Sequence, residues 1–160
     1  MTRLAALCLA ALALAATEAR AADYVSIVQE VEVARPPEAV WKKVGGYCDL
    51  GGWMRTSCEI TAGKDGEVGA VRRIAGRIDE VLVARNATSY TYAQPKSPID
   101  YHGTVEVAPA ADGKGTRIVY SLFYDAESLG TAEAKAADRA RRAAMFANVL
   151  KTMKTLAEAD

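Results

Sequence analysis

The segment from Thr131 to Ala159 decides the fold and reads TAEAKAADRARRAAMFANVLKTMKTLAEA. It contains no proline and no glycine, and it is rich in alanine, the residue with the highest helix propensity. Apolar residues recur in it at steps of three and four, namely Met145, Phe146, Val149, Leu150, Met153, Leu156 and Ala157. This spacing predicts one long amphipathic helix. The opposite face is expected to be solvated and carries Arg139, Arg142, Lys151, Lys154 and Glu158.

The residues before this helix alternate as strands do, with two short helical segments near the start. A first strand is predicted from Tyr24 to Ala34, a short helix from Pro37 to Val44, and a second helical segment from Asp49 to Trp53. Five more strands are predicted at residues 68–74, 78–84, 89–93, 101–108 and 117–124. Because short turns connect them, we expect an antiparallel meander. A long helix lying across such a sheet leaves an apolar pocket wherever side chains do not fill the space.

Residues 1–21 have the features of a secretory signal peptide. Arg3 precedes an uninterrupted apolar run from Leu4 to Ala16, and the small residues that follow predict cleavage after Ala21. A membrane anchor is the alternative, but the run is shorter than the roughly 20 residues that a spanning helix needs. We therefore expect a periplasmic or secreted protein without a stable membrane anchor, whose residues 22–160 form one domain.

The charge balance and the scarcity of ligand side chains exclude several functional classes. The 20 Lys and Arg residues equal the 20 Asp and Glu residues, so the chain lacks the basic surplus typical of nucleic-acid binding. One His and three Cys are too few for a His-based metal site, and no cofactor is expected. Alternation turns His102 outward, which leaves no Ser-His-Asp or Cys-His arrangement. Cys48 and Cys58 would form a disulfide in an oxidising compartment, the alternative being two buried free thiols.

Several short segments, taken in order, resemble the START-like or Bet v 1-like (SRPBCC) superfamily, specifically its bacterial polyketide cyclase/dehydrase and lipid-transport branch. They are VWKKV at 40–44, Trp53 followed by Cys58, VGAVR at 68–72, IDEVL at 78–82, YTY at 90–92, and the terminal helix. The resemblance implies an α+β helix-grip fold: an antiparallel sheet wrapped around a long C-terminal helix, with two short helices after the first strand. It also implies a hydrophobic cavity. It does not imply catalysis, because the fold hosts carriers, receptors and cyclases alike.

A more distant resemblance to the plant abscisic-acid receptors indicates which residues face inward. Glu80 and Tyr101 match cavity-lining residues of those receptors, and Tyr120 falls where they carry a cavity carboxylate. Thr56 replaces the receptors' cavity lysine, and their gate loop is reduced to Ala75-Gly76, so a hormone-receptor function is not supported. The residues predicted to contact a ligand are Trp53, Glu80, Leu82, Tyr92, Tyr101, Tyr120, Leu122, Met145, Val149 and Met153.

Glu80 is the most informative of these residues if it faces the cavity. A carboxylate in an apolar cavity needs a partner or has a raised pKa, and Arg72 or Arg73 on the preceding strand could supply the partner. Glu80 could then orient a ligand or act as an acid/base group. The alternative is a structural role, in which an arginine or strand-end backbone groups satisfy the carboxylate.

Three functions are compatible with these features, and the first is favoured. The first is an exported, monomeric or weakly dimeric binding protein that holds a small hydrophobic or amphipathic molecule between sheet and helix. The second is a cyclase or dehydratase that uses Glu80 with a cavity tyrosine as its acid/base pair. The third is a periplasmic accessory protein that acts through its surface and has an exposed apolar patch instead of a cavity.

Overall fold

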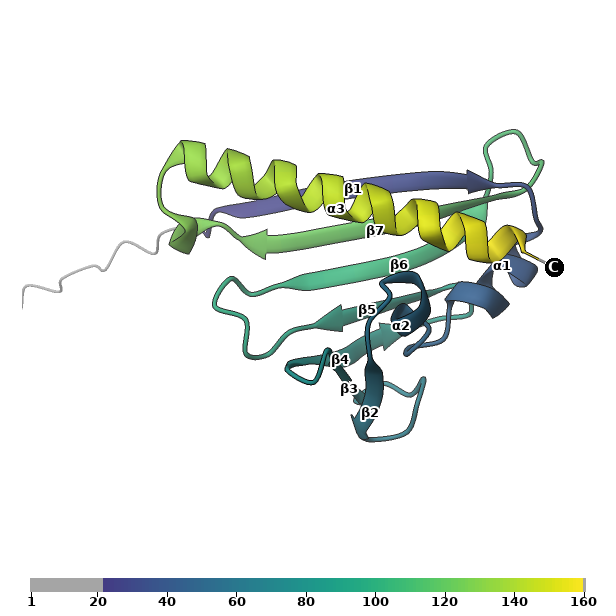
Figure 1. Ribbon diagram of the computed structural model, residues 1–160, viewed down its shortest axis with the longest axis horizontal. Coiled ribbons are helices and arrows are strands. Elements are labelled where there is room, and N and C mark those ends of the chain that lie inside the picture. The colour runs from purple at the N-terminus through teal and green to yellow at the C-terminus, as the bar shows by residue number, and fades with distance from the viewer. Residues whose placement is uncertain (1–21, 160) are drawn as a thin grey trace, which may run out of the picture.

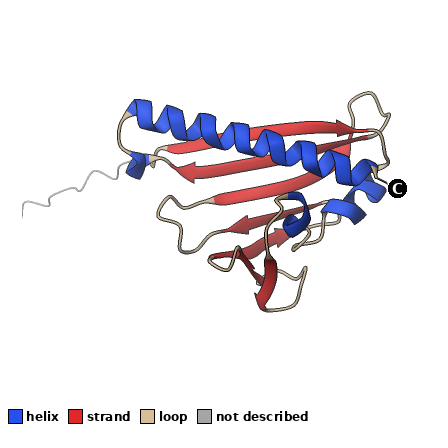
Figure 2. Ribbon diagram, viewed as in Figure 1, coloured by secondary structure: helices blue, strands red, loops and turns tan. Residues whose placement is uncertain are grey.

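The structure is a computed structural model that describes residues 22–159. The predicted signal peptide lies outside these residues and stays a prediction. Figures 1 and 2 show one sheet with a long helix lying along its face, which confirms the predicted α+β helix-grip architecture. The elements in chain order are β1 (Tyr24–Val33), α1 (Pro37–Val44), α2 (Leu50–Trp53), β2 (Cys58–Ala62), β3 (Val71–Ile74), β4 (Ile78–Arg85), β5 (Ser89–Ala93), β6 (His102–Pro109), β7 (Thr116–Asp125), the 3-10 helix η1 (Glu127–Leu129) and α3 (Ala132–Glu158).

All seven strands form one antiparallel sheet in the order β1-β7-β6-β5-β4-β3-β2. Strands β3 to β7 follow one another as the predicted meander, because each connection is short enough to return beside the preceding strand. Strand β2 was not predicted and extends the meander beside β3. The first strand pairs with the last one along its whole length, from Tyr24 opposite Asp125 to Val33 opposite Thr116. β1 and β2 are therefore the two edges of the sheet.

Strand β3 is shorter than predicted, since it begins at Val71 and not at Val68. The preceding residues form a turn that is closed by a hydrogen bond of 3.0 Å from Ala70 N to Glu67 O. Gly69 in this turn has a φ of 95°, a backbone conformation that glycine adopts without a steric penalty. The predicted start of this strand at residue 68 is therefore wrong, because Gly69 belongs to the turn.

Helix α3 is the predicted long helix, and Thr131 caps it by accepting a hydrogen bond from Ala134 N at 3.3 Å. It packs against β1 and β7 and buries Phe146, Val149, Leu150, Met153 and Ala157. Met145 and Leu156 were predicted in the same stripe but are 38% and 37% exposed, so the buried stripe is narrower than predicted.

Among residues 22–159, no helix combines the length and the apolarity that a membrane crossing requires.

The charged face of α3 is less solvated than predicted, because several of its side chains contact the sheet. Lys154 Nζ donates to Glu32 O at 2.6 Å, and Arg139 donates to a second carbonyl of the same strand. These bonds occupy backbone acceptors of the edge strand β1, which would otherwise be available to another strand. Arg142 departs furthest from the prediction, since its side chain is only 16% exposed and lies over the ring of Tyr124.

The hydrophobic core fills the space between α3 and the β1, β7 and β6 half of the sheet. Ile118, Leu122 and Leu150 are essentially fully buried there. Tyr120 continues the core toward the rest of the sheet, with its ring centroid 4.6 Å from that of Phe146. Beyond Tyr120 the packing is incomplete.

Candidate functional site

A cavity of about 720 Å³ lies where this packing is incomplete, between strands β3 to β5, the loop that precedes β6, and the first half of α3. Small-molecule sites commonly have volumes of about 300–1,000 Å³. Its apolar walls include Leu50, Ile78, Ile99, Tyr120 and Phe146. The cavity therefore has the size and the lining of a ligand site.

Three tyrosines form the aromatic wall: Tyr92 on β5, Tyr120 on β7, and Tyr101 directly before β6. The hydroxyls of Tyr92 and Tyr120 share a hydrogen bond of 2.8 Å, and the ring centroid of Tyr101 lies 6.3 Å from that of Tyr92. Tyr92 has room because Gly103 is opposite it on β6, where a Cβ atom would lie 2.3 Å from the Tyr92 hydroxyl. Burial raises the pKa of all three tyrosines. They are therefore neutral phenols, which offer apolar surface together with hydrogen-bonding hydroxyls.

Glu80 faces the cavity and forms a buried ion pair with Arg72, which lies directly opposite it on β3. Arg72 Nε donates to Glu80 Oε2 at 2.7 Å, and Gln94 Nε2 donates to the other carboxylate oxygen at 2.9 Å. Glu80 is 2% exposed and Arg72 is fully buried, so the pair is shielded from water. The predicted partner is thus confirmed as Arg72, whereas Arg73 pairs with Asp79 at 2.8 Å.

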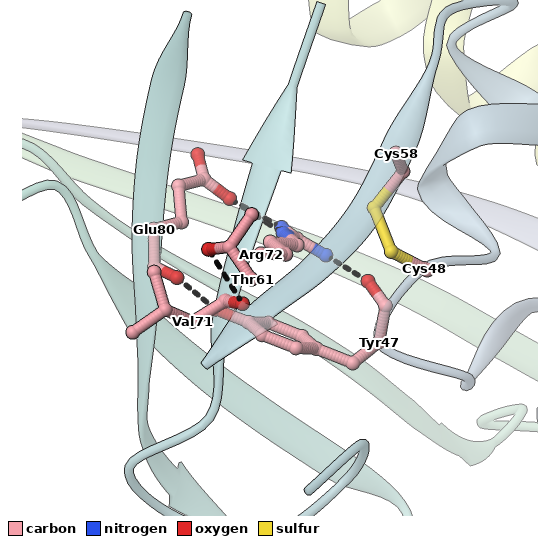
Figure 3. Close-up of a disulfide and its surroundings, with 7 residues drawn as sticks. All are labelled: Tyr47, Cys48, Cys58, Thr61, Val71, Arg72 and Glu80. Atoms are coloured by element: carbon pink, nitrogen blue, oxygen red, sulfur yellow. Dashed lines mark hydrogen bonds and ion pairs between the residues drawn. A yellow bond between two sulfur atoms is a disulfide. The ribbon is translucent and has the colours of Figure 1, made fainter. Parts of the chain in front are cut away.

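Tyr47 holds Arg72 from the side opposite Glu80, as Figure 3 shows. The Tyr47 carbonyl accepts a hydrogen bond from Arg72 Nη1, and the guanidinium carbon lies 4.2 Å from the centroid of the Tyr47 ring. The Tyr47 hydroxyl donates to the backbone carbonyl of Glu80 at 3.1 Å. The next residue is Cys48, which forms the predicted disulfide with Cys58 at the start of β2. The disulfide therefore fixes the segment that positions the arginine.

Charged side chains from α3 and from the turn between β3 and β4 line the cavity as well. Asp138 accepts hydrogen bonds from Arg142 Nε at 2.6 Å and from Arg141. Partial burial opposes ionisation, but these hydrogen bonds outweigh it and lower the pKa of Asp138. The Arg142 guanidinium carbon lies 4.6 Å from the ring centroid of Tyr124, which holds Arg142 against the sheet. Arg77, in the β3–β4 turn, is exposed and contributes a third guanidinium to the lining.

The ten residues predicted to contact a ligand divide into two groups. Five line the cavity, namely Glu80, Tyr92, Tyr101, Tyr120 and Met145. The other five lie elsewhere: Leu82, Leu122 and Met153 are fully buried in the core, and Trp53 and Val149 line a separate, more open groove beside α3. Ligand contact stays a prediction for all ten.

Gln94, Ile99 and Arg142 line the cavity but were not predicted to do so. Gln94 and Ile99 belong to the loop between β5 and β6, where neither strand alternation nor helical periodicity indicates a direction. Arg142 carried a usable signal, because it precedes the buried Phe146 by four residues and so lies on the same face of α3. Its charge favoured a solvent-exposed side chain, although its spacing from Phe146 indicated a side chain that faces the interior.

His102 lies outside this site, on the outer face of the sheet, as strand alternation predicted. Its ring stacks on Phe123 with 5.1 Å between the centroids. Among the residues that the structure describes, no group of three or more His, Cys, Asp and Glu side chains is placed to hold a metal ion. The polar groups that line the cavity include the tyrosine hydroxyls, the Glu80–Gln94 pair, Asp138 and the arginines.

An antiparallel sheet that grips a long C-terminal helix, with a cavity between the two, defines a helix-grip protein of the START-like class. Residues 24–158 match the family described as polyketide cyclase/dehydrase and lipid transport, and the chain belongs to this family. The match confirms the resemblance found in the sequence. A comparison with curated proteins gives no match.

Several solved structures have the same fold. A Nitrosospira multiformis protein is 20% identical with a TM-score of 0.63, over 81% of this chain and 96% of its own. A Thermobifida fusca protein is 19% identical with a TM-score of 0.66, over 82% of this chain and 94% of its own. The di-domain ARO/CYC BexL from the BE-7585A biosynthetic pathway is 18% identical with a TM-score of 0.65, over 86% of this chain and 51% of its own. At these identities the likeness shows the fold alone.

Proposed function

We propose that the protein is an exported binding protein that holds a small hydrophobic or amphipathic molecule between its sheet and α3. The observation that carries the proposal is the cavity of about 720 Å³ with its walls of tyrosine and aliphatic side chains. Protein interiors are close-packed, and apolar volume left empty reduces stability. A ligand explains why this part of the interior stays open. The apolar N-terminal run and the disulfide support export, because disulfides persist in oxidising compartments.

The contacts of Glu80 favour binding over catalysis. Both of its carboxylate oxygens already accept hydrogen bonds from the protein, one from Arg72 and one from Gln94, so the carboxylate is held in place and is not turned toward a reacting group. Tyr92 and Tyr120 bond to each other, and burial raises their pKa, so neither hydroxyl is a ready proton donor. A cyclase or dehydratase that uses Glu80 with a tyrosine remains the second candidate, supported by the family and by the position of both groups on the cavity wall.

A function exercised through the surface has less support. It predicts a continuous apolar patch in place of a cavity. Within residues 22–159, the large exposed hydrophobic residues are Tyr24, Val28, Val68, Val83, Met145 and Leu156. They are distributed over β1, the turn before β3, β4 and α3.

Native mass spectrometry of the gently purified, exported protein tests the proposal. We expect a chain that begins at Ala22 and carries one small organic molecule, which is released on denaturation. A chain that retains residues 1–21 would overturn the export part, independently of the ligand.

A pair of variants then locates the site on one strand. Ile78→Trp places a large side chain on the cavity wall, whereas Val83→Trp places it at an exposed position of the same strand. With N-phenyl-1-naphthylamine as a fluorescent apolar probe, we expect Ile78→Trp to abolish binding and Val83→Trp to leave it unchanged. Absence of probe binding to the wild type, or equal binding by both variants, would contradict the proposal.

A further inference from the structure

We infer that the molecule bound in the cavity is a small amphipathic anion whose single acidic group lies against Arg77 and Arg141. This inference rests on the proposed function and names the ligand class. The ligand has an apolar or aromatic body and one carboxylate, sulfonate or phosphate group at its end.

The charges of the cavity lining do not balance. It contains three guanidinium groups, from Arg77, Arg141 and Arg142, and two carboxylates, from Glu80 and Asp138. The charge of Glu80 is already matched by Arg72, which lies behind it. Asp138 alone therefore faces three arginines, and the lining keeps an excess of positive charge. An anion is the ligand that this excess attracts.

Two of the three arginines can receive such a group. Arg77 forms no ion pair or side-chain hydrogen bond within residues 22–159. Arg141 is 62% exposed and shares Asp138 with Arg142, which is held over two tyrosine rings. Arg141 can therefore turn to a ligand while Arg142 continues to satisfy Asp138. Guanidinium groups bind carboxylate and phosphate oxygens through paired hydrogen bonds, which gives direction as well as charge.

The rest of the cavity fits an uncharged body of limited size. Buried apolar and aromatic residues supply much of the remaining lining, among them Ile99, Tyr120 and Phe146. A volume of about 720 Å³ accommodates one compact organic molecule but not a phospholipid with two acyl chains. A small acid is therefore favoured over a membrane lipid as the source of the anionic group.

Two matched fluorescent probes test the inference. N-phenyl-1-naphthylamine and 8-anilinonaphthalene-1-sulfonate share one aromatic body, and only the second carries an anionic group. The variants are Arg77→Gln, Arg141→Gln and their combination. Arg139→Gln is the control, because it removes the same charge from α3 at a side chain that contacts β1 instead of the cavity. Circular dichroism and thermal unfolding establish that each variant is folded.

We expect Arg77→Gln and Arg141→Gln each to raise the Kd of the sulfonate probe about three- to ten-fold, and the combination to raise it further. The Kd of the neutral probe should change less than two-fold in every variant, and Arg139→Gln should leave both values unchanged. Added salt should weaken sulfonate binding only.

Failure of the inference differs from failure of the proposed function. If neither probe binds the wild type, the cavity is not a binding site and the proposed function fails. If the neutral probe binds but the sulfonate probe does not, or binds with a Kd that the arginine variants leave unchanged, the anion assignment is overturned while the binding function stands.

Discussion

The two halves of the sheet are built on different principles. Under α3, strands β1 and β7 pack through aliphatic side chains such as Ile118 and Leu122, which leave no accessible surface. Strands β3 to β5 extend beyond the edge of the helix in Figure 1 and instead bury Arg72 with Glu80 beside an open cavity. Packing stabilises the first half, and a disulfide and a polar network hold the second half. One sheet thus separates a stabilising core from a site that can stay open.

Removing one partner of the buried ion pair should have the largest effect on stability. Arg72→Met leaves the Glu80 carboxylate buried without its counter-charge, which should reduce the free energy of unfolding by about 3–5 kcal/mol. Arg73→Met is the control on the same strand. It breaks an ion pair that is partly exposed and should cost less than about 1 kcal/mol.

Urea denaturation measures the free energy of unfolding of both variants. The double variant Arg72→Met/Glu80→Met should regain much of the stability that Arg72→Met loses. Equal losses of unfolding free energy in Arg72→Met and Arg73→Met would show that the buried Arg72–Glu80 pair does not stabilise strands β3 to β5.

Truncating apolar side chains should separate the packed half from the open half. Leu122→Ala creates a void in a filled core and should reduce the free energy of unfolding by about 2–5 kcal/mol. Ile78→Ala removes atoms that already border open space, so it should cost less than half as much. The same denaturation experiment serves for both variants. A larger loss for Ile78→Ala would mean that the cavity wall is packed as tightly as the core.

The disulfide should stabilise the open half by a smaller amount. Replacing both Cys48 and Cys58 with serine removes a cross-link across ten residues and should cost about 2–3 kcal/mol. Because Tyr47 adjoins the cross-link, amide hydrogen exchange should also accelerate at residues 46–48. Addition of dithiothreitol to the wild type should reproduce the loss of stability and should not affect the double variant. A wild type insensitive to reductant would contradict this role.

The pH dependence of stability should show the smallest effect. Because the folded-state pKa of Asp138 is lowered, its contribution is complete above the unfolded pKa and is lost as the pH falls through the folded pKa. Asp138→Asn should therefore flatten the decline in unfolding temperature below about pH 4. Part of the decline should persist, since hydrogen bonds from Arg73 and Lys96 hold the pKa of Asp79 at about 2. If the dependence of the unfolding temperature on pH is the same in Asp138→Asn as in the wild type, the Asp138–Arg142 ion pair contributes nothing to stability.

The sequence predicted most helices and strands because the spacing of apolar residues reflects which side chains are buried. The inward faces that the resemblance and alternation predicted on β4, β6 and β7 are correct, since one face of each strand packs on the core. The failure at Val68 followed from a local competition, in which Gly69 favoured a turn over continued extension.

The candidate site was predicted only in part because a cavity is a property of the assembled fold. Tyr92 and Leu82 both face inward from their strands, yet only the tyrosine reaches the open space. Alternation gives the side of the sheet, but it does not show whether a side chain on that side meets the core or the cavity. Arg77 had no periodic signal at all, because it lies in the three-residue turn between β3 and β4.

Mapping a titration with N-phenyl-1-naphthylamine by amide-resolved NMR tests most directly whether the open half is the binding site. Chemical shifts should change at cavity-lining residues such as Ile78, Gln94 and Leu129. They should stay constant on the outer face, at Val28 and His102. Shift changes confined to the outer face, or no change in the presence of excess probe, would contradict a binding site between the sheet and α3.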